Sequence, residues 1–182
     1  NKEIVAGIHA SGGKAVGISG KDGALIQARP ADGSGRMGFV GEVQCVNPEL
    51  IEKVIENGYI PVIAPIGLGE EQQSYNINAD LVAAAIAVSM KADKLVLLTD
   101  VPGLMMNPAD SNSLISVLKV SEVENYVKEG IIAGGMVPKV QCCVEAVTGG
   151  VGRTHIIDGR VPHSILLEVF TDEGIGTMVV NE

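Results

Sequence analysis

The fold of this chain is decided by the sequence SYNINAD at residues 74–80 and by the patterns on its two sides. Before it, IPVIAPI at residues 60–66 is apolar without alternation, which is typical of a parallel strand covered on both faces. After it, the small apolar residues at 81–90 form a helical run. Helical segments and continuous apolar strands alternate from about residue 47 onward. We therefore expect an α/β fold, a three-layer sandwich with a mainly parallel open sheet.

The composition excludes several classes of protein. The chain has 182 residues, of which 46% are hydrophobic and 19% charged, so it can bury a substantial core. Its net charge of -9 argues against nucleic acid or an anionic membrane as a main partner, but not against a phosphorylated ligand. No apolar run reaches membrane-spanning length and no signal peptide is visible. We predict a cytoplasmic protein.

The cysteines and histidines do not predict a metal site or a disulfide framework. There are three cysteines, Cys45, Cys142 and Cys143, and the adjacent pair suits a disulfide framework poorly. The cysteine and histidine spacing does not match a zinc site. Cys142 and Cys143 fall in an apolar helical segment, where we expect them in the core. This cysteine usage fits a protein in a reducing compartment.

Polar side chains collect where the stretch 74–80 enters the helix. Asn78 is a good N-cap, and a capping role for it is as probable as a functional one. Asn76 and Asp80 lie four residues apart, so both could face one crevice. In open α/β sheets, ligands bind at the strand-to-helix turns beyond the carboxyl ends of the strands. An amide there can orient a substrate, and a carboxylate can position a lysine or a metal.

Two further stretches could bind phosphate. GGMVPK at residues 134–139 has successive glycines before a helix, which let backbone N–H groups approach an anion, and Lys139 lies one turn into that helix. The alternative is a glycine-rich connection with a surface lysine. TDVPGL at residues 99–104 leaves the carboxyl end of a buried strand and could be a nucleotide platform. By itself it is only a Pro-Gly turn.

In order along the chain, these segments resemble the acetylglutamate kinases of the amino acid kinase family. The matching stretches are VGISGKDG (16–23), YNINAD (75–80), LLTDVPGL (97–104), GGMVPK (134–139) and HIIDGRVPHS (155–164), continuing to residue 178. The resemblance implies ATP-dependent phosphorylation of the side-chain carboxylate of N-acetyl-L-glutamate, a step of arginine biosynthesis. It also implies Mg²⁺ held mainly by the nucleotide phosphates.

The resemblance implies a role for each matched residue. Asn76 is similar to the substrate-binding asparagine, and Asp80 to the aspartate that holds the catalytic lysines. Lys139 is similar to the lysine that stabilises the transferring phosphoryl group. The nucleotide-binding positions correspond to Thr99, Asp100, Gly103, Leu104, Gly135 and Met136. The acceptor carboxylate is already ionised, so we expect catalysis by alignment and charge neutralisation, without a general base.

The C-terminal run is most similar to the arginine-inhibited branch of these kinases. His155, Glu168 and Gly174 fall at positions that bind the feedback inhibitor L-arginine in that branch, and a carboxylate suits a guanidinium. The alternative for Glu168 is a solvated helix residue. The branch also implies a homo-oligomer, and some of its members bind a PII-type regulator.

The sequence departs from the family at its N-terminus. Relatives carry roughly a hundred more residues there, with a second catalytic lysine and a substrate-binding arginine, so this chain resembles a fragment. We expect residues 1–46 to belong to the acetylglutamate-binding lobe and residues 47–182 to the nucleotide-binding lobe. The chain alone should lack kinase activity. Alternatives are another amino acid kinase (for aspartate, glutamate or uridylate) and a non-catalytic arginine- or nucleotide-binding fragment.

Overall fold

The computed structural model describes residues 1–32, 37–110, 112–171 and 174–182. The chain forms two compact units, the N-terminal unit Asn1–Met90 and the C-terminal unit Lys91–Glu182, and each is described by itself. Both contain helices and sheets with parallel strand pairs, so the predicted α/β class is confirmed. The Gly, Pro, Asp and Arg residues at 29–38 predict an exposed loop, and part of this stretch, residues 33–36, lies outside the described residues.

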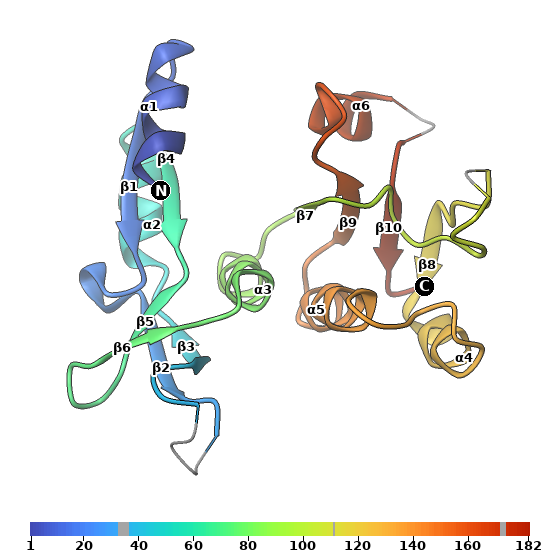
Figure 1. Ribbon diagram of the computed structural model, residues 1–182. Coiled ribbons are helices and arrows are strands. Elements are labelled where there is room, and N and C mark those ends of the chain that lie inside the picture. Colours follow the sequence, from blue (N-terminus) through green and yellow to red (C-terminus); the bar gives the residue numbers. More distant parts are fainter. Residues whose placement is uncertain (33–36, 111, 172–173) are drawn as a thin grey trace. The chain divides into compact units, whose positions relative to one another are not determined.

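The N-terminal unit contains two sheets (Figure 1). Its elements are α1 (Lys2–Ala10), β1 (Ala15–Ser19), the 3₁₀ turn η1 (Asp22–Ala24), β2 (Ile26–Pro30), β3 (Gly41–Val46), α2 (Glu49–Glu56), β4 (Ile60–Ala64), β5 (Ile66–Leu68), β6 (Ser74–Asn76) and α3 (Ala79–Ser89). Strands β1 and β4 pair in parallel. The second sheet has the order β3-β2-β5-β6 and mixes parallel and antiparallel pairs. Its antiparallel pairs are formed by strands that follow each other directly, as in hairpins.

The predicted strand at 60–66 is two strands in different sheets. Strand β4 ends at Ala64, Pro65 interrupts it, and β5 begins at Ile66. Proline has no N–H to donate to a sheet, so the chain leaves one sheet there and enters the other. The polar stretch that follows is also partly a strand, because Ser74–Asn76 pairs with β5 as β6. Asn76 therefore lies on a strand and not in the predicted turn.

The core of the N-terminal unit joins the four-stranded sheet to α2 and α3. Its buried side chains are Leu25, Ile26, Ala28, Ile51, Tyr75, Ile77 and Val82. Tyr75 and Ile77 alternate with the exposed Asn76, so this short strand buries one face and exposes the other.

Helix α3 begins with the predicted cap. The side-chain oxygen of Asn78 accepts hydrogen bonds from the backbone N–H groups of Asp80 (2.9 Å) and Leu81 (3.3 Å). These groups have no partner within the helix, so the cap satisfies them. Of the two interpretations of Asn78, the capping role is the one that the structure supports directly.

Replacing Asn78 with alanine should destabilise the protein by about 1 kcal/mol, because two helix N–H groups lose their acceptor. The free energy of unfolding from urea titrations measures the effect. Asn125→Ala is a suitable control, since Asn125 is an exposed residue within helix α4 (Val123–Lys128). Equal stabilities of the Asn78 variant and the wild type would contradict the capping role.

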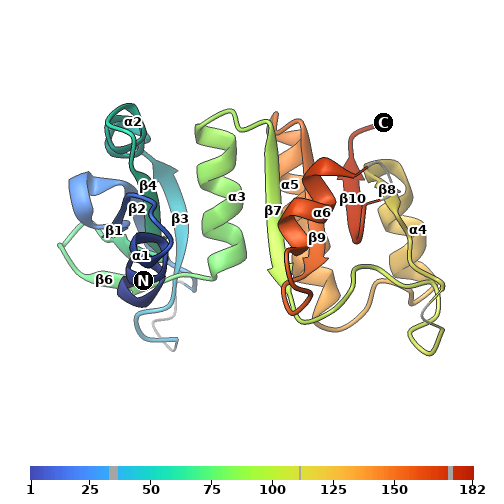
Figure 2. The same ribbon diagram turned by 90° about the horizontal axis from the view of Figure 1, so that it is seen from above.

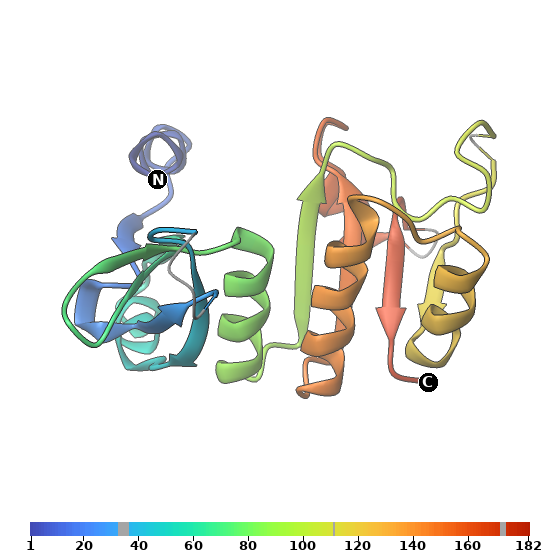
Figure 3. The ribbon, with the colours of Figure 1, turned by 60° about the horizontal axis from the view of Figure 1, so that its bottom comes forward.

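The C-terminal unit is a sheet covered by helices on both faces. Its elements are β7 (Lys94–Thr99), β8 (Val117–Lys119), the 3₁₀ turn η2 (Val120–Glu122), α4, α5 (Met136–Thr148), β9 (Arg153–Asp158), α6 (Ser164–Phe170) and β10 (Thr177–Val180). The strand order is β7-β9-β10-β8. Strand β7 is parallel to β9 and β8 to β10, whereas β9 and β10 are antiparallel. Figures 1 and 3 show α4 and α5 on one face of this sheet and α6 on the other, which is the nearer face in Figure 2.

The three-layer arrangement is thus present within the C-terminal unit, although its sheet is mixed. Strand β9 and the sheet's central part are buried between the layers, with Thr154, Ile156, Ile157, Thr177 and Val179 fully inaccessible to solvent. Cys142 and Cys143 lie on the buried face of α5, as predicted.

The predicted lobe boundary after residue 46 stays a prediction, whereas the compact units divide between residues 90 and 91. The reason is packing: β3 pairs with β2 and contacts α3, and α2 contacts β4, so residues 47–90 share a core with residues 1–46. The assignment of an acetylglutamate-binding and a nucleotide-binding lobe stays a prediction. No described helix is both long enough and apolar enough to cross a bilayer.

Candidate functional site

The predicted nucleotide residues of the C-terminal unit lie on segments that meet at one edge of its sheet. Strands β7 and β9 are parallel, and their carboxyl ends meet at the pair Thr99 and Asp158. Helix α5 precedes β9 and runs antiparallel to it, so its amino end lies at the same edge (Figure 3). Thr99, Asp100, Gly135 and Met136 are therefore at one edge of the unit, where α/β sheets bind ligands.

Thr99 closes the turn that leaves β7. Its hydroxyl donates to the carbonyl oxygen of Val101 (2.9 Å) and accepts from the N–H of Val101 (3.2 Å). Asp100 is exposed at the tip of this turn. The turn thus leaves Asp100 exposed at the sheet edge.

Gly103 and Leu104 are engaged in packing and hydrogen bonds within the unit. The N–H of Leu104 donates to the Thr177 hydroxyl (2.8 Å), and the Leu104 side chain is only 1% exposed. Gly103 has a φ of 151°, and a Cβ there would lie 2.6 Å from the Thr177 hydroxyl. Glycine is therefore required at 103 for close packing of this loop against β10.

Helix α5 begins at Met136, directly after two glycines. Gly134 has a φ of 54°, in the left-handed region that glycine adopts easily. Gly135 is the N-cap residue and has no side chain to block the helix N–H groups. Lys139 lies in the first turn of the helix and is half-buried. The N–H groups of Met136 and Val137 donate to the carbonyl oxygens of Ala133 and Gly134, and Pro138 has none, so an anion at this helix end would be attracted mainly by the helix dipole and Lys139.

An ion pair that sequence reasoning missed lies at the same edge. Both oxygens of Asp158 accept hydrogen bonds from the Arg160 guanidinium, at 2.9 Å from Nε and 2.8 Å from Nη2. These bonds, with the Arg160 N–H, lower the pKa of Asp158 to about 2 from an ordinary 3.8, so it is ionised at neutral pH. The sequence signal was the Asp-Gly-Arg turn directly after β9.

Asn76 and Asp80 belong to the N-terminal unit. Asn76 is exposed on β6, where its backbone N–H donates to the carbonyl oxygen of Phe39 (2.8 Å). Asp80 is half-buried in the first turn of α3. Lys139 is in the other unit, so the grouping of Asn76 and Asp80 with Lys139 stays a prediction.

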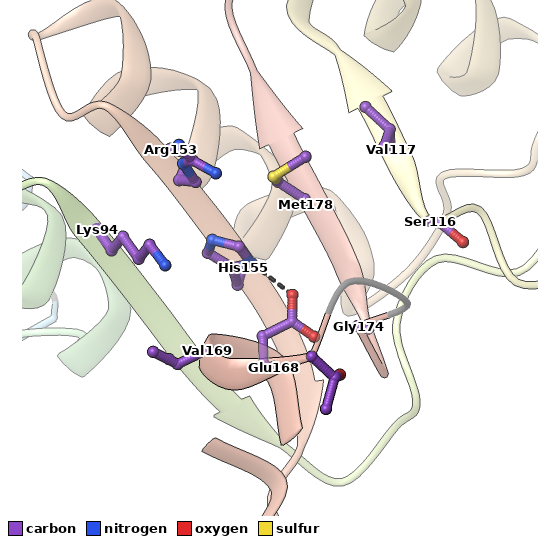
Figure 4. A pocket seen from close by; sticks show the side chains of 11 residues that line it. Lys94, Ser116, Val117, Arg153, His155, Glu168, Val169, Gly174 and Met178 are labelled. Atoms are coloured by element: carbon purple, nitrogen blue, oxygen red, sulfur yellow. Dashed lines mark hydrogen bonds and ion pairs between the residues drawn. The ribbon is translucent and has the colours of Figure 1, made fainter. Parts of the chain in front are cut away.

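A cavity of about 350 Å³ in the C-terminal unit brings together all three residues predicted to bind arginine (Figure 4). It is lined by Lys94, Ser116, Val117, Arg153, His155, Glu168, Val169, Thr171, Gly174, Gly176 and Met178. We call it the α6 pocket. The strand register brings the lining residues of the sheet together. Lys94 on β7 pairs with Arg153 on β9. Met178 on β10 pairs with His155 on β9 and with Val117 on β8. Helix α6 supplies Glu168 and Val169.

Glu168 and His155 form a buried pair in the α6 pocket. Oε1 of Glu168 lies 2.6 Å from Nδ1 of His155, and the two side chains are 6% and 5% exposed. Oε2 of Glu168 accepts from the N–H of Ile175 (2.8 Å). Burial favours the neutral form of Glu168, but the N–H of Ile175, His155 and the N–H of Gly176 outweigh it and lower the pKa. The predicted alternative, a solvated Glu168, is therefore wrong.

Two cations of the α6 pocket were not among the predicted residues. Lys94 begins β7 and Arg153 begins β9, and the two are neighbours in the parallel register. Figure 4 shows both side chains on the same side of the pocket as His155. Sequence reasoning could have found Arg153, because alternate residues of a strand face the same side and His155 follows two positions later. Lys94 could be found only from the structure, because the pairing of β7 with β9 places it beside Arg153.

The described residues contain no cluster of three or more His, Cys, Asp or Glu side chains that could hold a metal ion. Mg²⁺ bound mainly through nucleotide phosphates would need few protein ligands, and Asp100, in the turn after β7, is an exposed carboxylate of the donor type that Mg²⁺ takes.

Comparison with known proteins identifies the family. The sequence profile of the amino acid kinase family matches residues 1–158. An acetylglutamate kinase from Syntrophomonas wolfei is 96% identical over all 182 residues, which cover 63% of that protein. The chain thus spans less than two thirds of the length of this curated relative.

Two solved structures share the fold. One is smu.665 from Streptococcus mutans, with a TM-score of 0.82 and 27% identity over 100% of this chain and 66% of that one. The other is N-acetylglutamate synthase from Neisseria gonorrhoeae complexed with coenzyme A and L-arginine, with a TM-score of 0.77 and 27% identity over 93% of this chain and 38% of that one. From the match of its sequence over residues 1–158, the chain belongs to the amino acid kinase family.

Proposed function

We propose that the full-length protein uses ATP to phosphorylate the side-chain carboxylate of N-acetyl-L-glutamate. The observation that carries this proposal is the 96% identity, over the whole chain, to a protein named acetylglutamate kinase. The predicted nucleotide residues on β7 and α5, which share one edge of the C-terminal unit, are consistent with it. Asn76 is the proposed substrate ligand, and Asp80 the residue that orients the catalytic lysines.

The chemistry requires little beyond alignment and positive charge. The attacking carboxylate is ionised at neutral pH, so no proton has to be removed from it. Charge that develops on the transferred phosphoryl group has to be neutralised, and Lys139 in the first turn of α5, with the dipole of that helix, is suited to that. Mg²⁺, bound with the nucleotide, supplies further charge neutralisation.

L-Arginine is the proposed ligand of the α6 pocket, acting as an inhibitor. Glu168 is a buried acceptor suited to a guanidinium, and Lys94 with Arg153 offers two cations for an α-carboxylate. The cavity of about 350 Å³ lies within the usual range of small-molecule pockets. The related N-acetylglutamate synthase is described as a complex with L-arginine, which supports the same ligand here.

A cytoplasmic location, a homo-oligomeric full-length form and regulation by a PII-type protein are parts of the same proposal. They rest on resemblance to the arginine-inhibited branch. The net charge of -9 makes nucleic acid and anionic membranes poor partners.

Acceptor preference tests the proposed reaction. The full-length protein should phosphorylate N-acetyl-L-glutamate with ATP in preference to free glutamate, aspartate or uridylate. A coupled ADP-release assay with each acceptor measures this. Preference for another acceptor would favour a different amino acid kinase. The 182-residue chain should show no turnover, and measurable turnover by it would refute the proposal that it is a catalytically incomplete part.

Calorimetry with L-arginine and with ATP tests the remaining alternative, a non-catalytic fragment that binds one of these ligands. If the 182-residue chain binds L-arginine although it has no kinase activity, the α6 pocket is formed by this part of the protein alone. Binding of neither arginine nor ATP by this chain would rule out the alternative of a ligand-binding fragment.

A further inference from the structure

We propose that Arg160 binds a phosphate group of the nucleotide: Asp158 holds one edge of its guanidinium, and N–H groups of the other edge contact the phosphate. This inference rests on the proposed use of ATP and adds a residue to the predicted nucleotide site. Arg160 lies in the turn between β9 and α6, in the same unit as the nucleotide residues predicted on β7 and α5.

The turn that carries Arg160 is tied to the carboxyl edge of the sheet. Asp158 is the last residue of β9 and pairs with Thr99, the last residue of β7. The next N–H along the chain, that of Gly159, donates to the carbonyl oxygen of Thr99 (2.8 Å). Because Asp100 directly follows Thr99, these bonds hold Arg160 beside the segment that is predicted to bind the nucleotide.

Asp158 fixes the orientation of the Arg160 guanidinium. Its Oδ1 accepts hydrogen bonds from Nε (2.9 Å) and from the backbone N–H of Arg160 (2.9 Å), and its Oδ2 accepts from Nη2 (2.8 Å). The Asp158 side chain is only 11% exposed, so it is an anchored acceptor. A guanidinium that is held in plane at two points has less freedom to lose when it binds a ligand.

The guanidinium retains donors for a ligand. It has more N–H groups than the pair with Asp158 uses. Within the described parts of the chain, its side chain makes no further hydrogen bond, and 66% of it is exposed. The remaining N–H groups are therefore accessible at the edge of the sheet. Phosphate oxygens suit them, because a guanidinium can bind two such oxygens at once.

The charges at this edge indicate why a cation is needed there. Asp158 and Asp100 are both acidic and would repel a polyphosphate. The hydrogen bonds and charge of Asp158, with a further contribution from the charge of Asp100, raise the pKa of Arg160, so the guanidinium stays cationic beside both carboxylates. Arg160 thus offsets negative charge at the edge and gives the phosphates a positive group to approach.

Two substitutions of Arg160 in the full-length protein separate a phosphate contact from a role in the turn alone. Arg160→Gln removes the charge, whereas Arg160→Lys keeps it but loses the planar contact with both oxygens of Asp158. Calorimetry with ATP and Mg²⁺, without N-acetyl-L-glutamate, should show about tenfold weaker binding to the Gln variant and largely restored binding to the Lys variant.

Arg29→Gln is the matched control. Arg29 also pairs with a carboxylate, that of Glu42 at 2.6 Å, and its side chain is 63% exposed, close to the value for Arg160. It lies on β2 of the N-terminal unit. Its replacement removes the same charge elsewhere in the protein and should leave ATP affinity unchanged.

The outcomes distinguish this inference from the proposed function. Wild-type ATP affinity in Arg160→Gln would overturn the phosphate contact. Equally weak binding by the Gln and Lys variants would also overturn it, because the pair with Asp158 and not the charge would then be decisive. A comparable loss in Arg29→Gln would reduce the effect to net charge and refute the contact. No ATP binding by the wild type would overturn both proposals, whereas ATP binding with preference for another acceptor would overturn only the proposed reaction.

Discussion

Replacement of Lys139 with alanine in the full-length protein is expected to lower kcat by about a thousandfold, while the Kd for ATP changes much less. Lys139 lies in the first turn of α5, at the edge of the sheet where β7 and β9 end. A cation there stabilises charge that develops on the phosphoryl group during transfer. Since this charge is greatest in the transition state, the loss should appear in kcat more than in binding.

The matched control for Lys139 is Lys128. Lys128 lies on α4 of the same unit and pairs with the exposed Glu124 at 2.7 Å. Exposed pairs of this kind contribute little to stability, so Lys128→Ala should retain wild-type turnover. Steady-state rates and ATP titrations of both variants measure the difference. An unchanged kcat in Lys139→Ala would remove Lys139 from the mechanism and weaken the assignment of the α5 end to phosphoryl transfer.

Replacement of Glu168 with glutamine is expected to weaken L-arginine binding about a hundredfold without changing kcat in the absence of arginine. The substitution removes the negative charge of the α6 pocket but nearly preserves the shape of the side chain. A charge-assisted hydrogen bond to a guanidinium is roughly twice as strong as a neutral one, and burial of Glu168 limits compensation by water. Calorimetry and inhibition curves measure the two effects.

Glu124→Gln is the control for this second prediction. Glu124 is an acidic residue of the same unit, with a side chain that is 80% exposed, and its loss should leave arginine binding unchanged. If Glu168→Gln binds arginine as tightly as the wild type does, the α6 pocket is not the arginine site. If it instead lowers kcat without arginine present, Glu168 acts in catalysis or in holding the active conformation, which would contradict the proposed separation of the two sites.

Local patterns predicted the class of fold and the positions of most elements. The buried strand that was expected before TDVPGL is present as β7, which pairs in parallel with β9. The Asn78 cap was visible because capping depends on residues two and three positions away, which the sequence specifies directly. The run at 60–66 was predicted less well. Its apolar pattern is uniform, but Pro65 divides it between two sheets.

The candidate sites were predicted only in part. His155, Glu168 and Gly174 were identified from a contiguous motif, and the structure places all three in one pocket. Lys94 was not identified, because it is distant in sequence and enters the pocket through the register of β7 with β9. The Asp158–Arg160 pair was also missed, since a turn sequence does not reveal that the guanidinium contacts both carboxylate oxygens.

The α/β class, the Asn78 cap and the motifs of the amino acid kinase family could be predicted from the chain alone, because these depend on local spacing and residue type. Long-range packing sets the rest: SYNINAD is partly a strand, the chain divides into compact units after residue 90, and Glu168 is buried against His155. The physical reason is that strand pairing and burial depend on residues far apart in the chain. Such contacts set the charge and the free hydrogen-bonding groups of a site, which local patterns do not specify.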